Sequence, residues 1–313
     1  MKMSESVRSD SASMGYLLAD MQEIDWQEAL GRKQSILRLA DPTDSQLKAV
    51  AERFGLDELH IRDIRNAQHP PYFNRVESGS IHIILRFPVG HSDDDVEVSS
   101  VSILVDRKMC ALIWPGKRYH LFRDNDLAGL PVEECVSKII HMLVDYLLRR
   151  VYLLRNEMEE FEDEYLADVG NADLGKLLAM RKELSMLARH ARNNALVIDK
   201  LRLDEAYGDS VRLADAHEHM QRAASIAESR AEHALNVMQA IQSLLSQRLN
   251  EVMRFLAVIT VILTPMGIIA GIFGMNFTRM DVLAYPYGFA LSLWGMMILG
   301  AALALFFKIR KWW

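Results

Sequence analysis

Side chains that carry neutral oxygen atoms recur along an apolar stretch near the C-terminus. Asn250, Thr260 and Thr264 supply amide and hydroxyl oxygens. Steps of three and four residues connect them to Gly267 and Gly271, so these positions share one face of a helix. Such neutral oxygens, beside glycines that would keep a lumen wide, are compatible with the lining of a pore.

The same stripe has a second explanation, because small residues also let two membrane helices approach closely. If the stripe lines a passage instead, Met253 and Leu256 form an apolar constriction, which can gate by dewetting. Both hypotheses, packing and passage, place the stripe on a helix that crosses a membrane.

The apolar residues are concentrated in two C-terminal runs. Half of the chain is hydrophobic, but residues 255–278 and 282–307 contain no charged side chain at all. A membrane helix needs about 20 apolar residues. Two membrane-spanning helices are therefore predicted, and a pair of buried core helices in a soluble protein is the alternative.

Basic residues flank the two runs on the same side. Arg248 and Arg254 precede the first run, while Lys308, Arg310 and Lys311 follow the second. The first residues are polar and lack the apolar core of a signal peptide. By the positive-inside rule, both termini are expected in the cytoplasm of a multi-pass inner-membrane protein.

Composition excludes several other classes. The net charge of −6 gives no basic patch for nucleic acid. Cys110 and Cys135 are too few for a disulfide framework or a zinc ribbon. The chain has no phosphate loop, nucleophile elbow or paired-carboxylate motif. We therefore expect neither an enzyme nor a resident cofactor, and metal ions enter as cargo or as regulators.

The remaining sequence predicts an α/β domain that is followed by long helices. Asp41 or Thr43 would cap a helix that Gly55 ends, and β-rich runs follow it. Helices are expected near 131–167, 173–203 and 210–273. The predicted parts are a flexible N-terminus at 1–20, a cytoplasmic α/β domain at 21–130, antiparallel helices at 131–208, a stalk helix running into the first span at 209–276, an external loop at 277–285, the second span at 286–308 and a basic tail at 309–313.

One triplet at the end of the first span carries a family resemblance. Gly274-Met275-Asn276 resembles the signature of the CorA-like (two-TM-GxN) divalent metal cation transporters, which include CorA and ZntB. The stretch at 250–277 is similar to the first span of that family, and the run that ends in FFKIRKWW is similar to its second span and tail. Upstream, LDELHIRDIRNAQHPPYFNRV resembles a hallmark of its cytoplasmic domain. The resemblance covers residues from about 25 to 313.

The resemblance implies a funnel-shaped homopentamer in membrane lipid that conducts divalent cations. First spans would line the pore, and second spans would face lipid. Gly274, Met275 and Asn276 would form the selectivity mouth. Asn276 amides and Gly274 carbonyls can hydrogen-bond the water shell of Mg²⁺ without removing it. The alternative for Asn276 is a simple helix C-cap at the membrane surface.

The loop after the triplet departs from the family pattern. Related loops often contain Met-Pro-Glu-Leu, but here Asp281 replaces the proline and Val282 the glutamate. Arg279 adds a positive charge, which would weaken cation attraction, and Asp281 would partly offset it.

The resemblance also implies a metal-sensing site between a stalk acid and an acid on a neighbouring α/β domain. Asp215 falls at the corresponding distance from Asn250, and Glu218 and His219 follow on nearly the same face. The acidic turn Asp93-Asp94-Asp95 would face them. The alternative is that all of these side chains are merely solvated surface residues.

Three functions follow from the sequence. The first is transport of hydrated Mg²⁺ through a pore lined by the first span. The second is ZntB-like transport of Zn²⁺, with Co²⁺ or Ni²⁺. This alternative is retained because His219 lies one helical turn beyond Asp215, a spacing that suits a metal ligand pair. The third is a membrane-anchored scaffold or sensor that conducts nothing.

Overall fold

The computed structural model describes residues 13–89, 97–116, 124–167, 173–208, 210–275, 286–310 and 312. The chain divides into two compact units. The α/β unit comprises Met1–Tyr165 and Asp173–Asn236, and the hairpin unit comprises Leu166–Ala172 and Val237–Trp313.

A seven-stranded mixed sheet forms the centre of the α/β unit, in the order β2-β1-β3-β7-β6-β5-β4. β3 and β7 pair in parallel with Leu37 opposite Ala111, and every other pair is antiparallel. The strands are β1 (Ser13–Leu17), β2 (Glu23–Ile24), β3 (Ser35–Ala40), β4 (Tyr72–Arg75), β5 (Ile81–Val89), β6 (Glu97–Val105) and β7 (Met109–Trp114).

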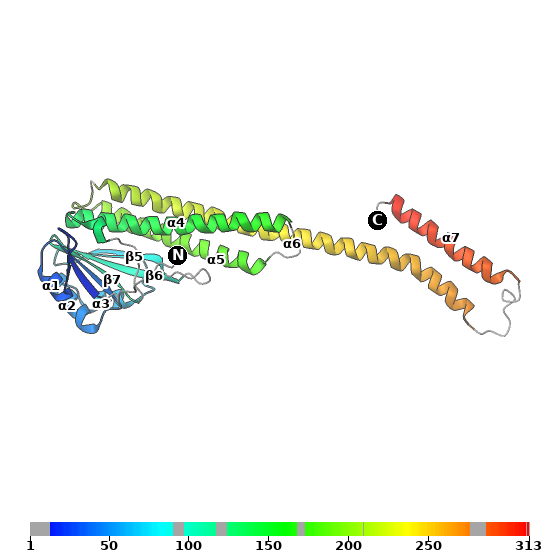
Figure 1. The fold of residues 1–313 in the computed structure, drawn as a ribbon, viewed down its shortest axis with the longest axis horizontal. Coiled ribbons are helices and arrows are strands. Elements are labelled where there is room, and N and C mark those ends of the chain that lie inside the picture. The colour runs from blue at the N-terminus through cyan, green and yellow to red at the C-terminus, as the bar shows by residue number, and fades with distance from the viewer. Residues whose placement is uncertain are drawn as a thin grey trace, which may run out of the picture. The chain divides into compact units, whose positions relative to one another are not determined.

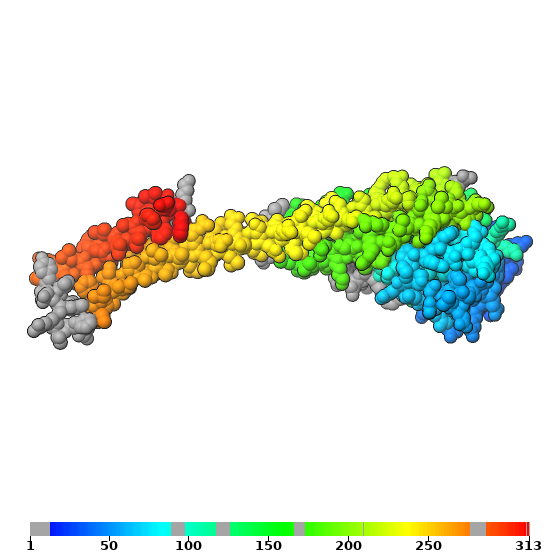
Figure 2. Space-filling model, turned by 180° about the vertical axis from the view of Figure 1, so that it is seen from behind, coloured from blue at the N-terminus to red at the C-terminus, as the bar shows by residue number. Residues whose placement is uncertain are grey.

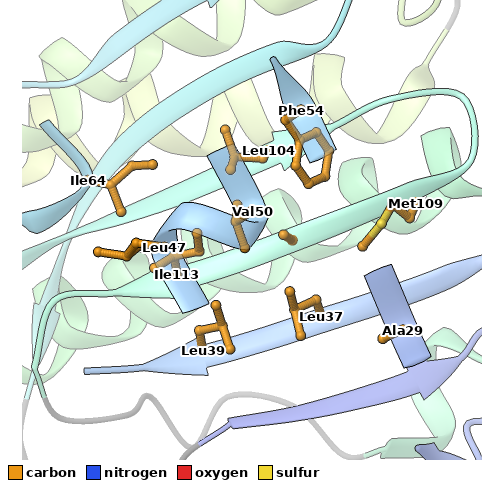
Figure 3. Packing of buried hydrophobic residues seen from close by; sticks show 11 residues of the cluster. Ala29, Leu37, Leu39, Leu47, Val50, Phe54, Ile64, Leu104, Met109 and Ile113 are labelled. Atoms are coloured by element: carbon orange, nitrogen blue, oxygen red, sulfur yellow. The ribbon is translucent and has the colours of Figure 1, made fainter. Parts of the chain in front are cut away.

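Three short helices cover one face of the sheet: α1 (Trp26–Gly31), α2 (Asp44–Phe54) and α3 (Glu58–Arg65). The Thr43 side chain caps α2 in a capping box with Gln46. Gly55 ends the helix with a φ of 72°, a backbone region that glycine adopts without a steric penalty. The apolar face of α2 packs on alternate strand residues (Figure 3), in a core of Ala29, Leu37, Leu39, Leu47, Val50, Phe54, Ile64, Leu104, Met109, Ala111 and Ile113.

Long helices accompany the sheet within the same unit (Figure 1): α4 (Val132–Ala167), α5 (Leu174–Arg202) and the first part of α6 (Val211–Phe273). Asn194 on α5 joins the sheet, because its amide accepts from the Arg86 backbone N–H at 3.0 Å and donates to the Arg86 carbonyl at 2.7 Å. Arg150 pairs with Glu183 at 2.7 Å between α4 and α5. With helices against both faces, β3 and β7 are buried at every position.

The hairpin unit pairs the last part of α6 with α7 (Gly288–Ile309). The two helices lie side by side in Figure 2, in orange and red. Gly300 is one point of contact, because a Cβ at this position would overlap the Met266 side chain. Small residues allow such close approach between membrane helices.

The observed fold differs from the sequence prediction in two places. The predicted flexible segment at 1–20 is wrong for residues 13–17, which form β1 through pairing with β2 and β3. The small residues of this segment have a low intrinsic preference for strands. Pairing with β2 and β3 specifies the strand instead, and the sequence does not show that pairing. The predicted boundary between 130 and 131 does not separate compact units, since α4 and α5 belong to the α/β unit.

Candidate ion pathway and metal cluster

Two helices of the described chain are long and apolar enough to cross a membrane. Their most apolar 18-residue windows have mean hydropathies of 2.4 in α6 and 2.1 in α7, and only 6% of each window is buried within the chain. In a single chain these apolar surfaces are therefore uncovered. Contact with lipid or with further copies of the chain would cover them.

α6 presents two different faces where it runs beside α7. Val258 is buried, and Ile262, Met266, Ile269 and Phe273 are half-buried, at steps of three and four residues. This face turns toward α7, as the contact of Met266 with Gly300 requires.

The predicted stripe lies on the opposite side of α6. At 100° per residue, its positions centre about half a turn away from the face that meets α7. All seven of its members are exposed: Asn250, Met253, Leu256, Thr260, Thr264, Gly267 and Gly271. The small residues are therefore not used for packing within one hairpin. The packing hypothesis therefore does not hold for the chain's own second span, and packing on another helix remains the alternative to a pore lining.

The local chemistry of the stripe favours acceptors over donors. The Thr260 hydroxyl donates to the Leu256 carbonyl at 2.8 Å, so its proton is occupied and its lone pairs face outward. Gly267 and Gly271 have open space where a Cβ would project. The stripe thus offers oxygen lone pairs beside an uncrowded backbone.

The predicted mouth lies at the C-terminal end of α6. Gly274 N–H donates to the Ala270 carbonyl at 2.9 Å and Met275 N–H donates to the Ile272 carbonyl at 3.2 Å, which terminates the helix. Asn276, Arg279 and Asp281 lie outside the described residues.

A second group of polar side chains connects α4 with α6 inside the α/β unit. His141 Nε2 lies 2.7 Å from Asp215 Oδ2, and His141 Nδ1 lies 3.2 Å from Asp145 Oδ2. His219 Nδ1 lies 3.3 Å from Asp145 Oδ1, and His219 Nε2 lies 3.6 Å from Asp215 Oδ1. Each imidazole thus stands between the same two carboxylates. We call these four residues the His-Asp cluster.

Only part of the predicted regulatory group joins this cluster. The hydrogen bond with His141 lowers the pKa of the Asp215 carboxyl below its ordinary value, and the charges of His219 and His141 add to the effect. Glu218 pairs instead with Arg222 at 2.8 Å. The predicted partners Asp93, Asp94 and Asp95 lie outside the described residues.

His141 and Asp145 were not among the site residues predicted from the sequence. A signal existed, because His141 and Asp145 are four residues apart on α4, just as Asp215 and His219 are on α6. That spacing puts both side chains of a pair on one helix face. What the sequence lacked was the contact between two helices whose facing residues lie 74 positions apart.

Fold and pathway together define a membrane protein with an α/β unit and an apolar hairpin whose first helix carries a polar stripe. The chain belongs to the CorA-like family, since the family described as "CorA-like Mg²⁺ transporter protein" matches residues 33–311. It is therefore a CorA-like divalent-cation transporter.

Individual relatives agree with this assignment. The "Cobalt/magnesium transport protein CorA" of Thermotoga maritima is 25% identical over 286 residues, which cover 85% of this chain and 79% of the relative. The complete structure of the CorA magnesium transporter from Methanocaldococcus jannaschii has a TM-score of 0.82 at 18% identity, covering 98% of this chain and 100% of that chain.

The cytoplasmic domain of a protein named ZntB shares part of the fold. The ZntB cytoplasmic domain from Vibrio parahaemolyticus RIMD 2210633 has a TM-score of 0.59 at 13% identity, covering 75% of this chain and 98% of that chain. At such identities a structural likeness defines the fold and leaves the transported metal open.

Proposed function

We propose that this protein moves hydrated Mg²⁺ across the inner membrane, through a pore that the α6 helices of a homopentamer line. The observation that carries the proposal is the direction of the oxygen-bearing stripe, on the side of α6 opposite α7. If α7 faces lipid, this geometry turns Thr260 and Thr264 toward the axis of a ring of copies.

The stripe suits an ion that keeps its water shell. Metal-bound water points its hydrogens outward and needs acceptors, and Mg²⁺ gives up water reluctantly. Because Thr260 donates its own proton to Leu256, it can only accept on its exposed side. Asn250 and Thr264 would continue this row, with Met253 and Leu256 as the apolar gate.

Gly274, Met275 and Asn276 would form the mouth of the pore. A ring of neutral amides at Asn276 attracts the hydrated ion without binding it tightly, so the ion can leave again. Arg279 and Asp281 would set the local charge of the loop and thereby the rate at which cations reach the mouth.

Oxygen donors along α6 favour Mg²⁺ over Zn²⁺ as the transported ion. Zn²⁺ is held in proteins mainly by histidine nitrogen and cysteine sulfur, and the described stripe offers neither. Zn²⁺ is the alternative cargo, which the fold shared with the ZntB domain leaves open. A non-conducting anchor is the remaining alternative, and an anchor would not need a stripe of oxygens.

We further propose that both termini lie in the cytoplasm. Arg248 and Arg254 stand before the apolar part of α6, and Lys308 and Arg310 stand at the end of α7. Basic residues remain on the cytoplasmic side of a span during insertion.

Flux into proteoliposomes tests the proposal. We expect voltage-driven Mg²⁺ uptake that exceeds Zn²⁺ uptake. Asn276→Ala should lower Mg²⁺ uptake about tenfold, because a hydrogen bond to a charged group contributes roughly 1.5–3 kcal/mol and about 1.4 kcal/mol corresponds to a factor of ten.

The matched control is Asn193→Ala, which removes an exposed amide of α5 and should leave uptake unchanged. Equal uptake by Asn276→Ala and wild type would contradict the assignment of the mouth. Zn²⁺ uptake that Mg²⁺ does not match would favour the ZntB-like alternative, and no uptake of either ion would favour the anchor.

A further inference from the structure

We propose that a hollow between α5 and α6 binds phosphate groups, either as free phosphate ions or as part of a larger phosphate compound. The hollow lies within the α/β unit and has a volume of about 260 Å³. Its polar lining comes from Arg181, Ser185, Arg189 and Arg192 on α5 and from Glu228 and Glu232 on α6. None of these residues belongs to the stripe or to the His-Asp cluster, so the inference does not depend on which metal ion the protein moves.

The basic residues of the hollow lie on one face of α5. Arg181, Ser185 and Arg189 follow one another at steps of four residues, and Arg192 comes three residues later. Such steps place side chains above one another on the same side of a helix. At 1.5 Å per residue, Arg181 and Arg189 are each about 6 Å from Ser185 along the helix axis. Both guanidinium groups can therefore reach an ion that lies over Ser185.

Two of the three arginines have no paired carboxylate. Neither Arg181 nor Arg189 forms a hydrogen bond or an ion pair with another residue in the part of the chain that the structure describes. The Nε atom of Arg181 is also shielded from solvent. A shielded donor without an acceptor is unfavourable, and the cost is larger for a charged group. An anion in the hollow would supply the missing acceptor.

The charge of the hollow is positive overall. Glu228 pairs with Arg192, so these two charges offset each other. Glu232 is exposed and forms no ion pair with the arginines of the described chain. Three arginines and two glutamates leave a charge of +1 in the lining, although the whole chain carries −6. The hollow therefore attracts an anion, and Glu232 is the charge that opposes it.

The donors of the hollow suit a phosphate group. The planar fork of a guanidinium donates two parallel hydrogen bonds to the oxygens of a phosphate or a carboxylate. A carboxylate has only two oxygens in one plane, whereas the phosphate of a phosphate ester presents three acceptor oxygens that point in different directions. Two arginines and the Ser185 hydroxyl can thus bind the same phosphate at once. We therefore assign phosphate rather than carboxylate as the ligand class.

The size of the hollow limits what it can enclose. Pockets that surround a drug-sized molecule have volumes of about 300–1,000 Å³, and this hollow has about 260 Å³. One or two phosphate groups would fit inside it, and the rest of a larger compound, such as a nucleoside, would extend into solvent. Free phosphate, pyrophosphate and nucleoside phosphates therefore share the chemistry that the site would recognise.

Calorimetric titration of the full-length protein in detergent tests the inference, with pyrophosphate as the probe and no divalent cation in the buffer. We expect the wild type to bind the probe. Arg181→Gln and Arg189→Gln should each weaken binding about tenfold or more, because each variant loses charged hydrogen bonds to the probe. Glu232→Gln should tighten binding about twofold to fivefold, because it removes the opposing charge. A gain of affinity of this kind is not expected from damage to the fold.

The matched control is Lys182→Gln. Lys182 is exposed and next to Arg181 on α5 but does not line the hollow, so this variant removes the same charge and should bind as wild type does. Inorganic phosphate and a nucleoside diphosphate are titrated in parallel to separate the two sources of the group. Equal affinity for pyrophosphate and the nucleoside diphosphate supports recognition of the phosphate groups alone. Tighter binding of the nucleoside diphosphate supports a larger phosphate compound as the occupant.

Folding is checked by the melting temperature of each variant without the probe, and Arg181→Lys is compared with Arg181→Gln because it retains the charge but not the fork. An affinity of Arg181→Lys between those of the wild type and Arg181→Gln, at unchanged melting temperatures, supports the site. Equal losses in Arg181→Gln and Lys182→Gln would overturn it, because they would show a general attraction of anions to α5. Failure of the wild type to bind pyrophosphate, or weaker binding by Glu232→Gln, would overturn it as well.

Discussion

His82 on β5 is a polar side chain in a fully buried position. Its ring packs against His60, with centroids 5.5 Å apart, and against Tyr72 at 6.1 Å. Neither ring nitrogen has a hydrogen-bond partner within the described part of the chain. Burial, with the nearby charges of His60 and His69, lowers the pKa of His82 to about 3. The folded protein therefore keeps this imidazole neutral.

This pKa makes the fold sensitive to acid. Between pH 6.5 and pH 3 the unfolded chain binds a proton at His82 and the folded chain does not. The free energy of unfolding therefore falls as the pH falls through this window. At pH 5 the loss amounts to about 2 kcal/mol. We expect His82→Leu to show a correspondingly smaller drop in thermal stability between pH 7.5 and pH 5.

The control for this experiment is His217→Leu, at a partly exposed position, which should retain the acid sensitivity of the wild type. Some sensitivity should remain in His82→Leu, because burial also lowers the pKa of His190 to about 4. An identical pH profile for wild type and His82→Leu would contradict the assignment.

At the same scale, sequence patterns predicted the site only in part. The stripe on α6 could be predicted because helical periodicity places its residues without knowledge of any partner. Asp215 was assigned by the family resemblance, through its distance from Asn250, and His219 by its helical spacing from Asp215. His141 and Asp145 could not be connected to them, because tertiary packing decides which helix faces lie together.

Among the elements, α6 was predicted closely and β1 was missed. The helix was expected near 210–273 and runs from Val211 to Phe273, since a long segment without breakers specifies a helix locally. β1 depends on hydrogen bonds to β2 and β3. The strand propensity of its own residues carries no information about these partners. The sheet order likewise required contacts between distant segments.

The two faces of α6 predict a periodic pattern of accessibility. If the stripe lines a pore, cysteines at Thr260 and Thr264 should react with a water-soluble thiol reagent at least about tenfold faster than cysteines at Ile262 and Ile269, because the reactive thiolate forms in water. Modification at the first two positions should also lower ion flux. The measurement is the labelling rate of each variant in proteoliposomes.

The wild-type chain provides the background for this scan. Cys110 and Cys135 are both buried, so they should label slowly in every variant. Faster labelling at Ile262 and Ile269 than at Thr260 and Thr264 would indicate that the stripe packs against another helix.

For the whole molecule, exposed apolar residues outside the charge-free span indicate assembly. Leu245, Leu249 and Val252 lie on one side of α6 and are exposed in the single chain. Arg248 and Arg254 lie in the same segment of the sequence. Because charged side chains are excluded from the hydrocarbon core, lipid alone would not bury this segment. Association with further copies would bury these side chains, in agreement with the proposed homopentamer.

Mass measurement by light scattering in detergent checks this assembly. We expect a protein mass of five times the 35.7 kDa chain. Leu249→Glu should reduce it, because each copy would lose about 1.5–3 kcal/mol of apolar burial and would bury a charge. Gln247→Glu, on the opposite side of the helix, should preserve the mass. A single-chain mass for wild type would contradict the pentamer.

The sheet of the α/β unit is completed by strands that are far apart in the chain. β3 and β7 pair in parallel from Ser35 opposite Met109 to Ala40 opposite Trp114, whereas β4 to β7 each pair with a strand next to them in sequence. Closing a loop of about 70 residues carries an entropy cost that hairpins avoid. The meander of β4 to β7 can therefore form early from local contacts, and we expect the addition of β3, followed by β1 and β2, to be the slow step of folding. A substitution at this parallel pairing should then lower the rate of refolding as well as the stability of the finished fold.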